Sequence, residues 1–176
     1  MTVPAAIWEQ VRQRAGCCCE FCGVTETDTG GQLTVDHFQP KAKGGTDDFD
    51  NLIYCCFRCN QYKHDYWPSI PHAPHVWNPR REQASQHFVE LDNGHVHPVT
   101  AVGAFTSRRL RLNRPPLVAW RVRRRQQAEE IRLLENYRDL VQLLAQLHRE
   151  KASLLDEQQG LLTEQRALLR LLLGGE

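Results

Sequence analysis

Four of the seven cysteines stand in two Cys-x-x-Cys pairs. Cys19 and Cys22 form the first pair, and Cys56 and Cys59 form the second, with 33 residues between the two pairs. Two thiolates at this spacing bind one ion from a single tight turn, and two such turns complete a tetrahedral site of four sulfurs, which favours zinc. The sequence therefore predicts a structural Zn²⁺ site that clamps two distant segments and contributes on the order of 10 kcal/mol to folding.

The other three cysteines are Cys17, Cys18 and Cys55. Pairing Cys18 with Cys22, or Cys55 with Cys59, is an alternative in which three residues separate the ligands. An odd number of cysteines argues against a disulfide framework, and so does an N-terminal stretch, MTVPAAIWEQVRQR, without the features of a secretory signal. We therefore expect a cytoplasmic protein with reduced cysteines.

The segment between the two pairs, together with the residues just after it, carries side chains suited to phosphodiester hydrolysis. They are Asp36, His37, Asn51, Asn60, Lys63 and His64. An imidazole can take a proton from water near neutral pH. A carboxylate and an amide oxygen are the hard ligands that Mg²⁺ prefers, and they leave further positions for water and phosphate. These residue types indicate metal-assisted cleavage of a nucleic acid.

The string VDHFQPKAKGGTDDFDNLIYCCFRCNQYKHD resembles the HNH endonuclease motif. That motif runs from Asp-His through a Gly-Gly loop and Asn-Leu to Cys-x-x-Cys, followed by Asn or His and a lysine. The resemblance covers residues 19–65, and residues 77–115 resemble the tail of many small bacterial HNH proteins. The last fifty residues carry no such resemblance. The family is mainly active on DNA, so the resemblance implies a DNA endonuclease, with RNA left open as a substrate.

On this reading His37 is the general base. Asp36 and Asn60 hold a catalytic Mg²⁺ or Mn²⁺, which stabilises the charge at phosphorus and the departing oxygen. Asn51 is expected to hydrogen-bond His37 through its backbone or side chain and so to fix the ring. The predicted catalytic set is therefore Asp36, His37, Asn51 and Asn60.

Besides Asn60, the candidate site residues Lys63 and His64 follow Cys59 within the predicted helix. The third HNH position is Asn60 rather than His, as in family members that include the nuclease domain of RNA-guided CRISPR enzymes. His64 lies one helical turn beyond Asn60 and is the alternative ligand of the catalytic ion. Lys63 is a candidate phosphate contact, with a solvated lysine as the alternative.

Short elements must position these groups. Apolar runs predict strands at residues 33–35 and 51–54, and the Gly- and Asp-rich stretch at residues 40–48 predicts a loop between them. Residues 59–66 fit two helical turns, and residues 5–15 fit a helix that ends near Gly16. Strand, loop, strand and helix give an α+β fold with a small ββα-metal core of the HNH, or His-Me finger, type. We expect this zinc-clamped core at residues 1–67 and a mixed extension at residues 68–126.

The extension ends in an arginine cluster. Residues 108–125 hold eight arginines and no acidic residue, although the whole chain has a net charge of only +1. Such a cluster can neutralise phosphates without reading bases, which predicts low sequence specificity. The alternative is a solvated helix face paired with the glutamates that follow. The predicted nucleic-acid contacts are Lys63, Arg108, Arg109, Arg111, Arg114 and Arg121.

Residues 127–176 are predicted to be helical and coiled-coil-like. One leucine recurs every seven residues, at Leu133, Leu140, Leu147, Leu154, Leu161 and Leu168. A second apolar stripe follows one position later, so the apolar face is wider than a dimer seam. A glycine in an exposed helix costs ~1 kcal/mol relative to alanine, so Gly160 could mark the turn of a helical hairpin. The alternatives are a hairpin packed on the protein's own body and a helix that self-associates or docks a partner.

Composition narrows the class of protein. Hydrophobic residues make up 41% and charged residues 24%, which is typical of a globular chain. No apolar run reaches the roughly 18 residues that span a bilayer, so no membrane is expected. The leading hypothesis is an HNH endonuclease with structural zinc, and the nuclease subunit of a bacterial defence or mobile-element system is one role that fits it. The alternative is a catalytically inactive zinc-ribbon module for nucleic-acid binding or assembly.

Overall fold

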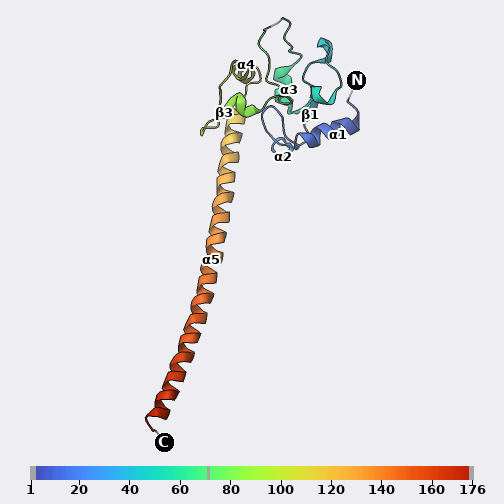
Figure 1. The fold of residues 1–176 in the computed structure, drawn as a ribbon. Coiled ribbons are helices and arrows are strands. Elements are labelled where there is room, and N and C mark those ends of the chain that lie inside the picture. The colour runs from blue at the N-terminus through green and yellow to red at the C-terminus, as the bar shows by residue number, and fades with distance from the viewer. Residues whose placement is uncertain (1–2, 71, 175–176) are drawn as a thin grey trace. The chain divides into compact units, whose positions relative to one another are not determined.

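The computed structural model describes residues 3–70 and 72–174. By their contacts these residues fall into two compact units, Met1–Arg123 and Arg124–Glu176. Figure 1 shows the order of the elements along the chain. The fold mixes helices and strands and ends in a long helix, as the sequence predicts. None of the helices in the described ranges is long and apolar enough to cross a bilayer.

The centre of the first unit is a ββα arrangement. Strand β1 (Thr34–His37) pairs antiparallel with β2 (Leu52–Cys55), and helix α3 (Phe57–Lys63) follows directly and lies against β1 (Figure 1). The first strand is longer than predicted, so Asp36 and His37 belong to it and pair with the buried residues Ile53 and Leu52. Two short 3₁₀ helices, η1 (Lys41–Lys43) and η2 (Phe49–Asn51), interrupt the connecting loop.

Burial of β2 anchors this centre. All four of its residues have no exposed surface, which is typical of a strand covered on both faces. Helix α1 (Ala5–Arg14) covers one side, with Trp8 edge-on to Tyr54 at 5.7 Å between ring centroids. The Tyr54 hydroxyl accepts from the Leu33 backbone N–H at 2.9 Å and donates to Glu26 of the short helix α2 (Glu26–Thr29). The strand is thereby fixed to both helices that precede the site.

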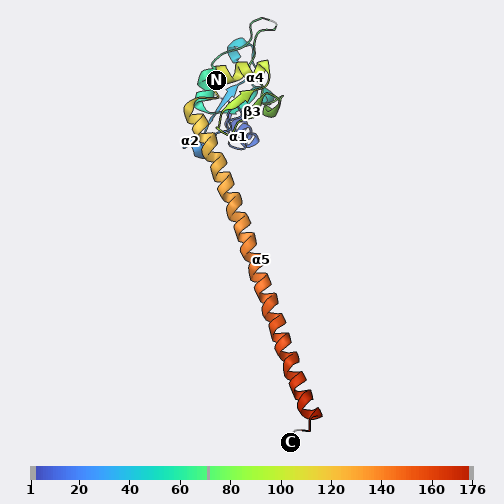
Figure 2. The same cartoon turned by 90° about the vertical axis from the view of Figure 1, so that its left-hand side faces the viewer.

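The extension up to Arg123 packs on this core as part of the same unit. The 3₁₀ helix η3 (Ala84–Gln86) comes first. Strands β3 (Phe88–Glu90) and β4 (Val96–Pro98) then form a hairpin, and helix α4 (Ala101–Arg109) packs against β4 (Figure 2). Trp77 is 4% exposed and lies edge-on to Phe21 of the first cysteine turn. Its backbone N–H donates to Thr106 of α4 at 2.7 Å. A buried aromatic contact therefore joins the extension to the cysteine segment.

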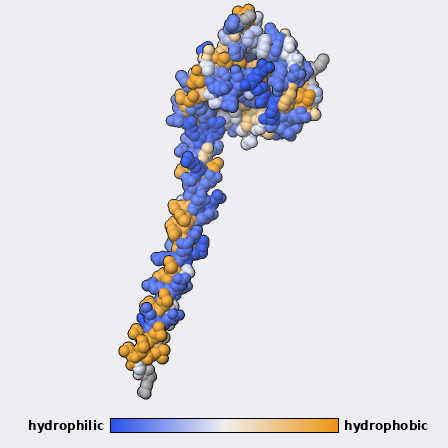
Figure 3. Space-filling view, in the orientation of Figure 1, coloured by the Kyte–Doolittle hydropathy of each residue, from blue (hydrophilic) through white to orange (hydrophobic). Residues whose placement is uncertain are grey.

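Helix α5 (Pro115–Leu172) is continuous over 58 residues. It runs through Gly160 without a turn, so the alternative of a helical hairpin at that residue is wrong. Residues 126–174 are all exposed, including the heptad leucines, which are 51–65% exposed. Apolar patches recur along this helix in Figure 3. Intrinsic helix propensity outweighs the ~1 kcal/mol cost of one glycine in so long a helix.

Candidate functional site

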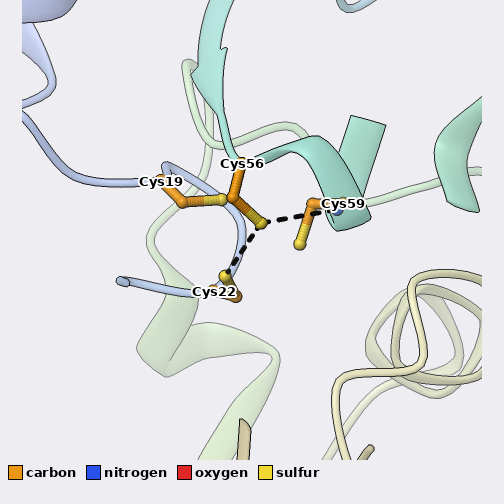
Figure 4. A group of neighbouring side chains, drawn as sticks. All are labelled: Cys19, Cys22, Cys56 and Cys59. Atoms are coloured by element: carbon orange, nitrogen blue, oxygen red, sulfur yellow. Dashed lines mark hydrogen bonds between the residues drawn. The ribbon is translucent and has the colours of Figure 1, made fainter. Parts of the chain in front are cut away.

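The four predicted cysteines meet at one point. Their sulfur atoms all lie within 4.8 Å of one another, and all four side chains are buried (Figure 4). The Sγ atoms of Cys22 and Cys56 are 3.8 Å apart. The first pair lies in a tight turn closed by a 2.8 Å bond from the Gly23 N–H to the Cys19 carbonyl, and the second pair begins helix α3. A buried set of four thiol donors in this compact arrangement fits Zn²⁺.

The three spare cysteines take no part in this cluster. Cys17 and Cys18 are half-buried, and Cys55 faces Thr34 rather than the other sulfurs. Burial raises the pKa of Cys55 well above its ordinary value, which keeps it a neutral thiol. The pairing of Cys19 with Cys22 and of Cys56 with Cys59 is therefore the arrangement adopted, and not the alternative spacings.

Arg114 borders the sulfur cluster. Its Nη2 atom lies 3.9–4.0 Å from the sulfurs of Cys22, Cys56 and Cys59. Burial opposes the charged form of this guanidinium, yet the three thiolates raise the pKa of Arg114 above its ordinary value. A Zn²⁺ with four thiolates carries a net charge of −2, and a fixed guanidinium offsets part of it. Sequence reasoning assigned Arg114 to nucleic acid and missed this role, for which the sequence offers no signal.

Three of the four predicted catalytic residues lie around one pocket of the ββα centre, and Asn51 does not line it. Asp36 and His37 at the end of β1 line one pocket of about 410 Å³ together with Asn60 and His64 of the following helix segment. The amide nitrogen of Asn60 lies 3.5 Å from the Thr34 hydroxyl, which leaves its amide oxygen as a ligand atom. The pairing of β1 with β2 and the contact of α3 with β1 bring these residues together.

His37 has a carboxylate partner that sequence reasoning missed. Its Nε2 atom lies 2.7 Å from Asp47 Oδ1, while Lys41 donates to the other oxygen at 2.6 Å. Hydrogen bonds from Lys41 and then from His37 lower the pKa of Asp47, so it is ionised near neutral pH and can only accept. The proton of the neutral ring therefore sits on Nε2, and Nδ1 is the acceptor. The only sequence signal for this partner was the acidic pair at residues 47–48 in the loop.

Lys63 is not free to bind a phosphate, contrary to one expectation from the sequence. The residue is 1% exposed. Its Nζ atom donates to Asp36 Oδ2 at 2.8 Å, to the His37 carbonyl at 2.7 Å and more weakly to the His64 carbonyl at 3.4 Å. The solvated alternative is wrong too, because Lys63 braces the end of α3 against the two site residues of β1.

Asn51 does not hydrogen-bond the His37 ring in this structure. Its amide oxygen accepts from the Gln39 N–H at 2.8 Å, and its amide nitrogen donates to the carbonyls of Gln39 and Thr46 at 3.1 and 2.8 Å. Its backbone carbonyl accepts from the Phe38 N–H, the residue directly after His37. These hydrogen bonds bring the Gly-Gly turn close to Gln39. Only glycine fits at position 45, because a Cβ there would lie 1.8 Å from the Gln39 carbonyl oxygen. Asn51 therefore orders the loop that carries Asp47.

The predicted arginine contacts separate into two groups. Arg121 is 3% exposed and donates to the Gly94 carbonyl, and Arg109 donates to the Lys63 carbonyl and lies over the Tyr66 ring. These two support the fold, because their guanidinium groups are already engaged by the protein. Arg108 and Arg111 are exposed and remain available to a ligand.

Comparisons with known proteins agree with this geometry. Residues 19–66 match the family model described as HNH endonuclease. The chain is 39% identical over 61 residues to a protein named CRISPR-associated endonuclease Cas9 from Corynebacterium diphtheriae, a match that covers 34% of this chain and 5% of that protein. No solved structure matches the chain. With the four-cysteine cluster and the ββα centre, residues 19–66 thus form a domain of the HNH endonuclease family.

Proposed function

We propose that this chain is a metal-dependent endonuclease that hydrolyses phosphodiester bonds of DNA with low sequence specificity. The observation that carries the proposal is the common pocket of Asp36, His37 and Asn60, in which the His37 ring is oriented by Asp47. One proton acceptor and two hard oxygen ligands around one cavity are the groups that such a reaction needs.

Each residue has a defined part. Nδ1 of His37 takes a proton from the attacking water, and the carboxylate of Asp47 stabilises the imidazolium that forms. Asp36 and Asn60 would hold a Mg²⁺ or Mn²⁺ through Asp36 Oδ1 and the Asn60 amide oxygen, because Lys63 already occupies Asp36 Oδ2. When bound, that ion neutralises charge on the phosphate and on the 3′ oxygen. The new P–O bond forms from water, the P–O3′ bond breaks, and solvent protonates the leaving oxygen.

His64 is the less suitable ligand for this ion. Its Nδ1 atom engages the neighbouring carboxylate of Asp65, and its side chain is 73% exposed. A hard amide oxygen from Asn60 also suits Mg²⁺ or Mn²⁺ better than an imidazole does. We therefore assign Asn60, and not His64, to the ion.

The exposed helix α5 gives the proposal a second part. Within residues 124–174 no other segment packs on its leucine repeat, and the leucines are exposed. A sustained seven-residue repeat is typical of a helix that pairs with another helix. We propose that this segment self-associates or docks a protein partner, as in a defence or mobile-element assembly that supplies targeting. Light scattering on chains with and without residues 127–176 tests self-association, and an unchanged monomeric mass would remove it.

The decisive experiment is a cleavage assay on supercoiled plasmid, single-stranded DNA and RNA. The zinc-loaded protein is incubated with Mg²⁺, with Mn²⁺ and without either ion. We expect nicking of the plasmid that depends on the added ion. Binding of DNA with no cleavage under any of these conditions would favour the alternative, a zinc-ribbon module without catalysis.

A further inference from the structure

Helix α3 presents a broad exposed arc. Successive residues are about 100° apart around a helix, so the seven residues of α3 and His64 cover its whole circumference. Only Cys59 and Lys63, which point in neighbouring directions, are buried. The rest of the circumference forms the exposed arc, which begins at Asn60, beside Lys63, and ends at Tyr62, beside Cys59. Its members, in order around the helix, are Asn60, His64, Phe57, Gln61, Arg58 and Tyr62.

The two ends of this arc face different pockets. Asn60 and His64 line the pocket that also contains Asp36 and His37. On the other side, Tyr62 and Arg58 line a separate pocket of about 760 Å³. Its wall contains four arginines and no acidic residue; the arginines are Arg58, Arg108, Arg111 and Arg114. Arg114 offsets the thiolates, so the charges of Arg58, Arg108 and Arg111 are those that select an anion.

The second pocket is pre-organised. The guanidinium of Arg111 lies over the Tyr62 ring at 4.9 Å from its centroid, and that of Arg114 at 5.9 Å. Arg111 has a φ of 49°, a left-handed conformation that non-glycine residues rarely adopt and that concentrates at functional positions. Within residues 3–70 and 72–174, neither Arg108 nor Arg111 forms an ion pair. The guanidinium of Arg111 is therefore held over Tyr62 without being neutralised, and the exposed Arg108 lines the same pocket.

We propose that a nucleic-acid strand crosses α3, with the scissile phosphate in the Asp36–Asn60 pocket and a flanking phosphate in the arginine pocket beside Tyr62. The inference rests on the proposed nuclease function. A helix with its side chains is about 10–12 Å wide, so the two phosphates lie on one strand about that far apart. Phe57, which is 65% exposed and lines the Asp36–Asn60 pocket next to Arg58 in the sequence, contacts the sugar and base between those phosphates.

The test is DNA binding by the full-length, zinc-loaded chain, measured by fluorescence anisotropy of a labelled duplex without Mg²⁺ or Mn²⁺. The Arg108→Gln/Arg111→Gln variant is compared with Arg166→Gln/Arg170→Gln, which removes the same charge from exposed sites on α5. Each phosphate contact contributes about 0.9 to the slope of log affinity against log salt concentration. Because the two arginines bind one flanking phosphate, we expect the slope to fall by about 0.9 in the first variant and to stay at the wild-type value in the second.

The outcomes separate this inference from the nuclease function. An unchanged slope in the Arg108→Gln/Arg111→Gln variant, or an equal fall in the control, would overturn the arginine pocket even if the wild type cleaves DNA. A selective fall in a protein that never cleaves would support the pocket and remove the nuclease. Phe57→Ala should weaken binding with an unchanged salt slope, because it removes an uncharged contact. A changed slope would contradict its assigned place.

Discussion

Replacing Lys63 with methionine tests the internal brace of the site. The methionine fills much of the same space but removes the charge, leaving Asp36 and the His37 carbonyl without their donor. Breaking a buried charge pair from one side costs about 3–5 kcal/mol. The Lys63 side chain is 2% exposed but that of Asp36 is 22% exposed, so water can solvate the carboxylate in part and the lower end of the range applies. We expect a loss of about 3 kcal/mol.

Urea unfolding of the zinc-loaded protein measures this loss. With a slope of about 2 kcal/mol/M, typical of a small domain, the midpoint should fall by about 1.5 M. Lys43→Met is the matched control, since Lys43 is exposed and should leave the midpoint unchanged. A wild-type midpoint for Lys63→Met would refute the assignment of Lys63 as a structural brace and reopen its role as a phosphate contact.

Three other perturbations follow from the same contacts. Hydrogen bonds from Arg12 and then Tyr54 lower the pKa of Glu26 to about 2 from an ordinary 4.5. The stability that Glu26 contributes is therefore complete above pH 4.5 and is lost as the pH falls toward 2. The difference in urea midpoint between wild type and Glu26→Gln should be constant from pH 7 to 5 and shrink below; a constant difference would contradict this. Arg114→Met should release zinc faster to a chromogenic chelator, and an unchanged rate would exclude a stabilising role for the guanidinium. Asp47→Asn should slow plasmid nicking without changing zinc content, whereas a wild-type rate would show that this carboxylate does not orient the base.

The sequence was most informative where chemistry requires a fixed spacing. The two Cys-x-x-Cys pairs identified all four members of the sulfur cluster, and the order of strands and helix was correct. Asp36, His37 and Asn60 line one pocket, and their shared catalytic role stays a prediction. The spacing within each cysteine pair and the apolar run of each strand are local properties, which explains why they can be read from the chain.

The partners of single side chains could not be read in this way. Lys63 follows the second cysteine pair like a surface lysine, yet the direction of α3 points it inward, toward Asp36. Asn51 was expected to hydrogen-bond His37, but its side chain hydrogen-bonds the backbone of Gln39 instead. The conformation of the loop determines which backbone groups lie within its reach. Arg121 belongs to an arginine-rich run, and only tertiary packing shows that it is buried. These outcomes depend on contacts between distant segments.

The most direct test of the catalytic assignment is the plasmid-nicking rate of His37→Ala relative to wild type, with zinc content verified as equal in the two proteins. Loss of nicking by a protein that still holds its zinc and still binds DNA is the predicted result. Undiminished nicking by His37→Ala would remove this imidazole from the reaction and contradict the account of the pocket.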